Sequence, residues 1–222
     1  MKVLIVSATN FEVQPLYNQL FEHSKEKLPL QLGEVTVHFF VAGVGLMPTA
    51  FTLGKHLTLE QYDLVIQAGI AGSYRRDWEL GKVVHVVAER AADVGVEEAD
   101  GRFTDVFELE LTDPNEVPYQ KGWLHQPDAA SFQFLPQAKG LSVNKVSGTE
   151  KSIEQISANY PADIENMEGA AFFYACLLSQ QPFLSIRSIS NYVEVRNRAN
   201  WNLPLAIQNL NNTLFELLKN LR

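Results

Sequence analysis

Residues 162–196 read ADIENMEGAAFFYACLLSQQPFLSIRSISNYVEVR, and this stretch decides the fold that the sequence predicts. It begins as a short strand that ends in Met167 and Glu168, continues as a helix opened by small residues, and closes with an apolar strand over residues 182–189. Such an apolar run is typical of a strand that is covered on both faces. The order strand, helix, strand therefore predicts an α/β fold.

The ends of the two strands are expected to lie side by side, because a right-handed crossover makes the strands parallel. Glu168 ends the first strand and Asn191 follows the second, so a carboxylate and an amide should face one crevice. Ligands of open α/β sheets bind at the carboxyl ends of the strands. We therefore expect a binding site that contains both side chains.

Length and composition are those of one globular domain. The chain has 222 residues, 46% of them hydrophobic and 20% charged, which are ordinary proportions. No Pro/Gly/Ser-rich or charged stretch suggests a linker, so we expect residues 1–222 to form a single domain. The formal net charge of −8 argues against nucleic-acid and anionic-membrane partners, since both need a basic face.

Cysteine usage and the start of the chain bear on the compartment. The single cysteine, Cys176, lies in an apolar helix, where a buried structural thiol is expected. Only four apolar residues follow Met1-Lys2, too few for a signal peptide, and no stretch approaches the ~20 apolar residues of a membrane span. We therefore expect a cytoplasmic protein.

Glu12 lies in the first turn of the first predicted helix. A buried strand over residues 3–6 breaks at Ser7-Ala8-Thr9-Asn10, and the helix follows from about Phe11. A carboxylate in this position gains typically ~0.3–1 kcal/mol from the helix dipole, so Glu12 could simply stabilise the helix. It also lies at the end of the first strand, where a ligand would bind.

Two glycine-rich turns follow predicted strands. Residues 35–41 lead into Ala42-Gly43-Val44-Gly45, and residues 64–66 lead into a bend over residues 67–73. The first turn could belong to a dinucleotide-binding loop, but the third glycine and the acidic ribose ligand of that motif are missing. Glycines of this kind let the backbone approach a ligand closely.

The remaining segments are less distinctive. Residues 91–136 have the weakest pattern, and such stretches often carry binding loops. A strand is predicted over residues 141–146, before the bend Ser147-Gly148-Thr149. Apolar residues at helical spacing predict an amphipathic helix over residues 203–221.

Residues 162–196 resemble the nucleoside phosphorylase and nucleosidase superfamily. The resemblance is carried by Asn166-Met167-Glu168 followed by Gly169-Ala170-Ala171, and by Arg187-Ser188-Ile189-Ser190-Asn191. The resemblance covers almost the whole chain. It implies a single-domain three-layer fold, with a mixed central sheet flanked by helices. It also implies a small-molecule purine nucleoside as substrate, no metal or organic cofactor, and a homodimer or higher homo-oligomer in which a neighbour borders the pocket.

Within this superfamily, the segment after residue 190 is most similar to the futalosine hydrolases, purine nucleosidases of a menaquinone pathway; the shared residues are Ser190-Asn191-Tyr192-Val193, Arg196, Arg198 and Trp201. This resemblance implies hydrolysis of the N-glycosidic bond of futalosine to hypoxanthine and dehypoxanthine futalosine. The alternatives are a methylthioadenosine/S-adenosylhomocysteine nucleosidase, a 6-oxopurine nucleoside phosphorylase and a non-catalytic nucleoside-binding protein.

The resemblance assigns three catalytic residues. Glu12 would be the general base on the attacking water. Glu168 would accept hydrogen bonds from the ribose hydroxyls and favour the cationic sugar of the transition state. The NH₂ of Asn191 would donate to N7 and O6 of a 6-oxopurine, although asparagine is also a common turn former. Arg187, within the last strand, is expected to make a buried ion pair near Glu168.

The expected substrate-binding residues surround these three. Met167 would form an apolar floor under the sugar, and the glycine-rich turns would contribute Gly43, Ile70 and Gly72. Ser152 follows the bend 147–149, where adenosine-type nucleosidases carry an aromatic residue that stacks on the base. Arg196 or Arg198 would pair with the benzoate carboxylate of the substrate, since a guanidinium is a planar fork for carboxylates; solvated surface charges are an equal contender.

Two departures from the family pattern bear on the reaction. Phosphorylases commonly carry a phosphate-binding arginine two residues before the first glycine of the second turn, where this chain has Gln67. A neutral amide is a poor substitute for a cation on a dianion, so water is the expected nucleophile, although Arg75 and Arg76 lie nearby in the sequence. The missing aromatic residue near Ser152 disfavours adenine.

Overall fold

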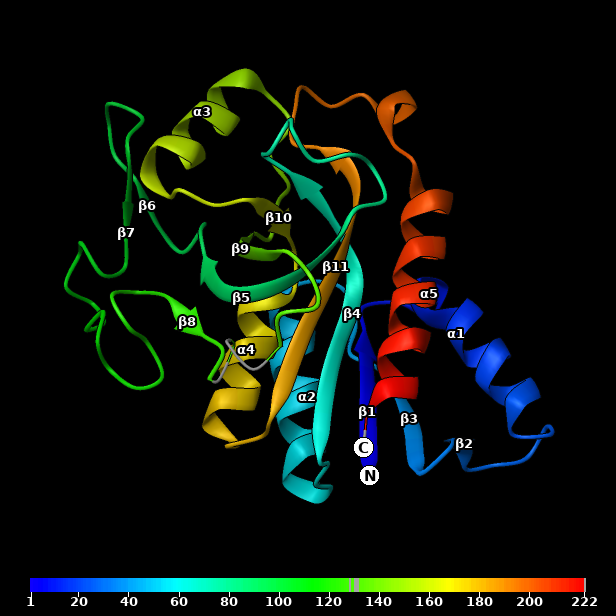
Figure 1. Ribbon diagram of the computed structural model, residues 1–222. Coiled ribbons are helices and arrows are strands. Elements are labelled where there is room, and N and C mark those ends of the chain that lie inside the picture. The colour runs from blue at the N-terminus through cyan, green and yellow to red at the C-terminus, as the bar shows by residue number, and fades with distance from the viewer. Residues whose placement is uncertain (128, 130–131, 222) are drawn as a thin grey trace.

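The computed structural model describes residues 1–127, 129 and 132–221 (Figure 1). The strands of its main sheet are β1 (Lys2–Ser7), β2 (Leu30–Leu32), β3 (Val35–Val41), β4 (Leu64–Ser73), β5 (Val83–Ala91), β8 (Leu124–His125), β9 (Gln137–Ser142), β10 (Ile164–Asn166) and β11 (Phe183–Tyr192). Their order is β10-β9-β5-β11-β4-β1-β3-β2, with β8 paired to β5. A separate hairpin pairs β6 (Gly95–Glu97) with β7 (Phe103–Asp105), so residues 91–136 contain short strands.

Helices cover both faces of the main sheet. They are α1 (Asn10–His23), α2 (Leu46–Leu59), α3 (Glu150–Asn159), α4 (Gly169–Leu178) and α5 (Leu203–Asn220), together with the short 3₁₀ helix η2 (Arg198–Asn200). Figure 1 shows α1 and α5 side by side on one face, and α2 and α4 together on the other.

Two apolar cores hold these layers together. Leu16 and Leu214 pack with Ile66 between α1, α5 and the sheet, whereas Phe172 packs with Val65 on the opposite face. Each of these side chains is almost fully buried, and burying one such side chain contributes about 1.5–3 kcal/mol. Because β1 is parallel to β3 and β4 while β5 is antiparallel to β11, the sheet is mixed. The predicted fold, a mixed sheet between helices, is confirmed.

Part of the sheet closes on itself. The three-residue strand β10 pairs in parallel with β9 and in antiparallel with the end of β4, so β4, β11, β5, β9 and β10 form a closed ring. The prediction that the strands flanking α4 are parallel is therefore wrong, since β11 is parallel to β4 and β10 is antiparallel to it. A strand as short as β10 joins the two ends of the ring rather than extending beside β11.

Several predicted boundaries also differ. The glycine-rich stretch 67–73 is not a bend but continues β4, because it pairs with β11 through Tyr192. Asn191 consequently lies inside β11, and Glu168 is the N-cap of α4 rather than a strand residue. β9 covers residues 137–142 and ends before the predicted limit at residue 146.

Two simpler expectations concern Cys176 and membrane spans. Cys176 is fully buried, as predicted, and burial raises the pKa of its thiol well above the ordinary value. Within the part of the chain that the structure describes, no helix combines the length and the apolar character needed to cross a bilayer.

Candidate active site

Glu12 connects the start of α1 to β4. Thr9 is the N-cap of α1, and Oε2 of Glu12 accepts hydrogen bonds from the N–H and the hydroxyl of Thr9, at 3.0 and 3.1 Å. This is a capping box, so the predicted helix-stabilising role is present. The other oxygen, Oε1, accepts a bond of 3.3 Å from the backbone N–H of Ile70. The two sets of donors fix the orientation of the carboxyl group.

Burial changes the protonation of Glu12. The residue is only 7% exposed, and burial raises the pKa of its carboxyl. The charge of Arg187 opposes this shift, while the charge of Glu168 adds to it. A carboxylate with a raised pKa is a better proton acceptor near neutral pH than an ordinary one.

Glu168 and Arg187 form a buried ion pair, as the sequence predicts. Nη1 of Arg187 lies 3.5 Å from Oε2 of Glu168, and the two residues are 1% and 6% exposed. The other oxygen of Glu168 accepts a bond of 3.2 Å from the N–H of Gly45, at the start of α2. A side chain at Gly69 would collide with Arg187 and touch Glu12. The glycine therefore gives these groups the room in which they meet.

A network behind Glu168 was not predicted from the sequence. The N–H groups of Glu168 and Gly169 both donate to Oδ1 of Asn166, and Nδ2 of Asn166 donates to the fully buried Glu89 at 2.7 Å. Burial raises the pKa of the Glu89 carboxyl to about 7, although Arg187 and hydrogen bonds from neighbouring side chains oppose the shift. An acid inside the largely apolar strand β5 was the available signal in the sequence.

Asn191 faces a second acid across Gly72. Gly72 is paired in register with Asn191 of β11 on one side and with Glu165 of β10 on the other. All three line a cavity of about 60 Å³. Glu165 is 5% exposed and accepts bonds from the hydroxyl of Tyr74, at 2.8 Å, and from the N–H of Ser147, at 3.0 Å. The cavity thus places a carboxylate opposite a carboxamide.

The amide of Asn191 has defined partners. Its Nδ2 donates to the carbonyl of Tyr192 at 2.9 Å, and its Oδ1 accepts from the hydroxyl of Ser190 at 2.8 Å. Because the Ser190 hydroxyl donates to the oxygen, the NH₂ group is the end that remains for an acceptor on a ligand. Nδ2 also lies 3.0 Å from where a Cβ of Gly72 would stand, so a larger residue at this position would press on the amide.

Arg196 lines the same cavity as Asn191. Its backbone N–H donates to the carbonyl of Gly148 at 3.2 Å, and its guanidinium lies over the ring of Trp201, 5.2 Å from the centroid. The guanidinium of Arg198 also lies over this ring, at 5.8 Å. The two exposed arginines and the half-buried tryptophan that the sequence singles out therefore form one cluster beside Asn191.

Other predicted binding residues lie in different surroundings. Ser152 is the N3 residue of α3, where its hydroxyl and that of Thr149 form a capping box, and it does not line the Asn191 cavity. Gly43 accepts a bond from Thr49, and it is Gly45 rather than Gly43 that contacts Glu168. Met167 is half-buried in the connection between β10 and α4.

The structure places the predicted catalytic residues in two separate groups, and neither Glu12 nor Glu168 lines the Asn191 cavity. Glu12 and Glu168 meet at Arg187 beside Gly69, and Asn191 lies at Gly72, three residues along β4, or roughly 10 Å. Among the described residues, no three His, Cys, Asp or Glu side chains are grouped as they would be around a metal ion.

Comparison with known proteins gives one consistent family. The phosphorylase superfamily matches residues 2–219. Futalosine hydrolase of Thermus thermophilus is 30% identical over 81% of this chain and 80% of its own length, and the 5′-methylthioadenosine/S-adenosylhomocysteine nucleosidase of Maridesulfovibrio salexigens is 28% identical over 87% of both chains. The nucleosidase of that kind from Colwellia psychrerythraea, solved with adenine, has a TM-score of 0.78 at 21% identity and covers 98% of this chain and 94% of that one.

Proposed function

Because this chain belongs to the phosphorylase superfamily, we propose that it hydrolyses the N-glycosidic bond of futalosine, releasing hypoxanthine and dehypoxanthine futalosine. Its relatives are futalosine hydrolases and methylthioadenosine/S-adenosylhomocysteine nucleosidases, which makes the chain an N-glycosyl hydrolase of purine nucleosides. The choice of futalosine depends on which purine the site accepts.

The position of Asn191 opposite Glu165 is the observation that carries this choice. A 6-oxopurine offers two acceptors, N7 and O6, and a donor at N1, whereas adenine offers a donor at its 6-amino group and an acceptor at N1. The NH₂ of Asn191 complements N7 and O6, and the acceptor-only carboxylate of Glu165 complements an N1–H. Adenine would place its N1 lone pair against that carboxylate. The pair therefore favours hypoxanthine.

The sugar end of the site supports hydrolysis. In the proposed reaction the C1′–N9 bond breaks, the water oxygen bonds to C1′, and Glu12 accepts the proton that the water loses. The negative charge of Glu168 stabilises the cationic sugar and its oxygens accept the ribose hydroxyls. The NH₂ of Asn191 donates to N7 and so stabilises the negative charge of the departing base. The base then takes up a proton from solvent, because an amide does not supply one.

Water is favoured over phosphate as the nucleophile. Gln67 is 3% exposed, and its side-chain oxygen accepts a bond of 3.0 Å from the hydroxyl of Ser185, so this position presents no cation. Arg75 is paired with Asp77 at 2.7 Å and with Asp163 at 3.3 Å. Arg76 is paired with Glu194 at 2.8 Å. Both arginines already have carboxylate partners.

One assay separates the candidate functions. The protein is incubated with futalosine, inosine or methylthioadenosine, with and without phosphate, and the free base is followed by chromatography. The proposal predicts hypoxanthine from futalosine at a rate that phosphate does not change. Release of adenine would instead select the methylthioadenosine nucleosidase, a requirement for phosphate would select the phosphorylase, and binding without release would select the non-catalytic alternative.

A further inference from the structure

Glu89 is a buried carboxylate that the proposed reaction does not use. It is fully buried in β5, and its carboxyl group lies between β9 and the first turn of α4. A Cβ at Gly140 or at Gly169 would collide with this carboxyl group. Two neighbouring elements thus carry no side chain where the carboxyl group stands, so the fold is built around it.

Both hydrogen-bond partners of Glu89 hold the start of α4. Oε1 accepts from Nδ2 of Asn166 at 2.7 Å, and Oε2 accepts from the hydroxyl of Ser142 at 2.9 Å. Asn166 in turn accepts the N–H groups of Glu168, at 3.0 Å, and Gly169, at 2.6 Å, while Ser142 accepts the N–H of Ala170 at 2.7 Å. Three consecutive N–H groups at the helix start are therefore satisfied through two side chains that Glu89 anchors.

We propose that Glu89 is a positioning residue for Glu168, acting through Asn166 and Ser142. An asparagine amide can turn over, and the carboxylate of Glu89 fixes the orientation in which Nδ2 points toward β5 and Oδ1 points toward α4. That orientation holds the backbone of Glu168, whose carboxylate meets Arg187 and, under the proposed function on which this inference rests, the ribose hydroxyls.

The burial of Glu89 is difficult to explain as a contribution to stability alone. Buried ionisable groups cost desolvation, and replacing them by apolar residues of similar volume is often neutral or stabilising. The polar contacts of Glu89 are with Ser142 and Asn166, the side chains that hold Glu168 and the start of α4. A role in precise placement of the sugar-binding carboxylate accounts for these contacts.

Two substitutions separate hydrogen bonding from charge and volume. In Glu89→Gln, the amide oxygen still accepts from Asn166 and the new NH₂ donates to Ser142, whose hydroxyl is free to donate to Oδ1 of Asn166, 3.2 Å away. In Glu89→Leu, both acceptors are lost at similar volume. We expect Glu89→Gln to keep kcat/KM within about three-fold of wild type, and Glu89→Leu to lose about 10²-fold, as misplaced reacting groups do.

A control variant and a double variant exclude a general structural effect. Leu214→Ala removes a fully buried side chain of α5, on the opposite face from α4, and is expected to lower the unfolding temperature without lowering kcat/KM. The double variant Glu89→Leu/Glu168→Gln should have a kcat/KM less than about three-fold below that of Glu168→Gln alone. The reason is that the side chain which Glu89 positions no longer carries a carboxylate. If the fold-losses in kcat/KM of the two single variants multiply in the double variant, the proposal is overturned. It is also overturned if Glu89→Gln loses as much kcat/KM as Glu89→Leu.

A readout without substrate keeps this test separate from the proposed function. Amide hydrogen exchange at residues 168–170 should become faster in Glu89→Leu but not in Glu89→Gln or Leu214→Ala. If wild type releases adenine rather than hypoxanthine, the futalosine assignment fails while the kinetic test remains valid, because both nucleosides carry a ribose. If no nucleoside is cleaved, the exchange rates alone decide, and unchanged exchange in Glu89→Leu overturns the positioning role.

Discussion

Nη1 of Arg187 lies 3.5 Å from Oε2 of Glu168, and both residues are buried. The same guanidinium opposes the rise in the pKa of Glu12 that burial causes, and it also opposes the rise at Glu89. One arginine therefore compensates three buried acids, Glu12, Glu89 and Glu168. This arrangement makes Arg187 the group on which the ionisation of the site depends.

Replacing Arg187 by methionine should be strongly destabilising at pH 8. Removing one partner of a buried pair typically costs about 3–5 kcal/mol, because the remaining carboxylate keeps its desolvation cost. The folded protein already raises the pKa of Glu12 and that of Glu89, so it favours the protonated form of both acids. Stability therefore falls as the pH rises through their folded pKa values. The loss should therefore be smaller at pH 5. Urea unfolding at the two pH values tests this, and an equal loss at both would contradict it.

The acid side of the pH–rate profile should belong to Glu12. Its folded pKa lies above the ordinary 4.5, and a general base works only when ionised, so kcat/KM should rise with pH through that raised value. Glu12→Gln should lower kcat by about 10²–10⁴-fold with little change in KM, and the rise should disappear. A variant that keeps the wild-type rise would show that another group titrates.

Base selectivity should depend on the pair Asn191 and Glu165. Glu165→Gln replaces an acceptor by an amide that can also donate to N1 of adenine, so the ratio of kcat/KM for inosine to that for adenosine should fall. Leaving one buried polar group unpaired costs about 1–3 kcal/mol, which corresponds to roughly 5–150-fold in this ratio. Competition assays with both nucleosides measure it directly. An unchanged ratio in Glu165→Gln and in Asn191→Asp would place the base elsewhere.

How far the sequence predicts this site depends on how local each signal is. The sequence predicts that Glu12 lies in the first turn of α1 and that Arg187 pairs with Glu168, because a residue at a strand end or within an apolar strand has a defined location in an α/β fold. Glu89 could not be placed, because its partners Ser142 and Asn166 are 53 and 77 residues away in the chain. Only the assembled sheet brings these three side chains together.

The direction of β10 was mispredicted for a related reason. A strand of three residues carries almost no periodic pattern, so its pairing is set by the ring that it closes between β9 and β4. The position of Glu165 beside Gly72 follows from that antiparallel pairing. The acid opposite Asn191 was thus as difficult to predict as the strand itself.

Replacing Arg196 is predicted to affect the reaction of futalosine more than that of inosine. Its guanidinium is exposed at the rim of the Asn191 cavity, beside Trp201, which suits contact with a large or charged substituent. Arg196→Ala should raise KM for futalosine by about three- to ten-fold, as for a partly solvated ion pair, and leave inosine turnover unchanged. Arg198→Ala serves as the comparison on the same ring. If both variants leave both substrates unchanged, the two arginines are surface charges.

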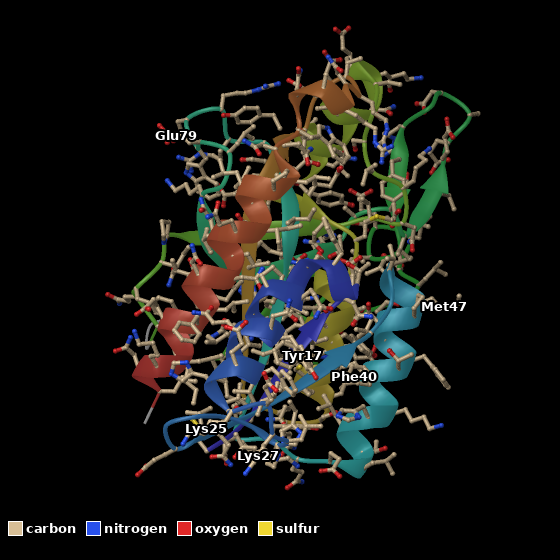
Figure 2. The ribbon with its side chains drawn as sticks, turned by 90° about the vertical axis from the view of Figure 1, so that its right-hand side faces the viewer. Tyr17, Lys25, Lys27, Phe40, Met47 and Glu79 are labelled. Carbon is tan, nitrogen blue, oxygen red and sulfur yellow. The ribbon has the colours of Figure 1, made fainter. Side chains whose placement is uncertain are left out.

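The outer face of α2 should be a contact between copies of the chain. Met47 and Phe51 are 79% and 70% exposed, and a spacing of four residues puts them on one side of the helix, where Figure 2 shows Met47 at its outer surface. Met47 also lines a largely apolar cavity of about 410 Å³, together with the half-exposed Tyr174. Exposed apolar groups gathered in this way are typical of protein interfaces.

We therefore expect a homodimer or higher homo-oligomer in solution, in which Phe51→Glu weakens association because it buries a charge in the contact. Light scattering during size-exclusion chromatography should give a multiple of the 24.9 kDa chain mass for wild type and a lower mass for Phe51→Glu. Leu28→Glu is the matched control, since Leu28 is 72% exposed before β2, in a different part of the fold. A monomeric wild type, or equal masses for wild type and Phe51→Glu, would remove α2 from the interface.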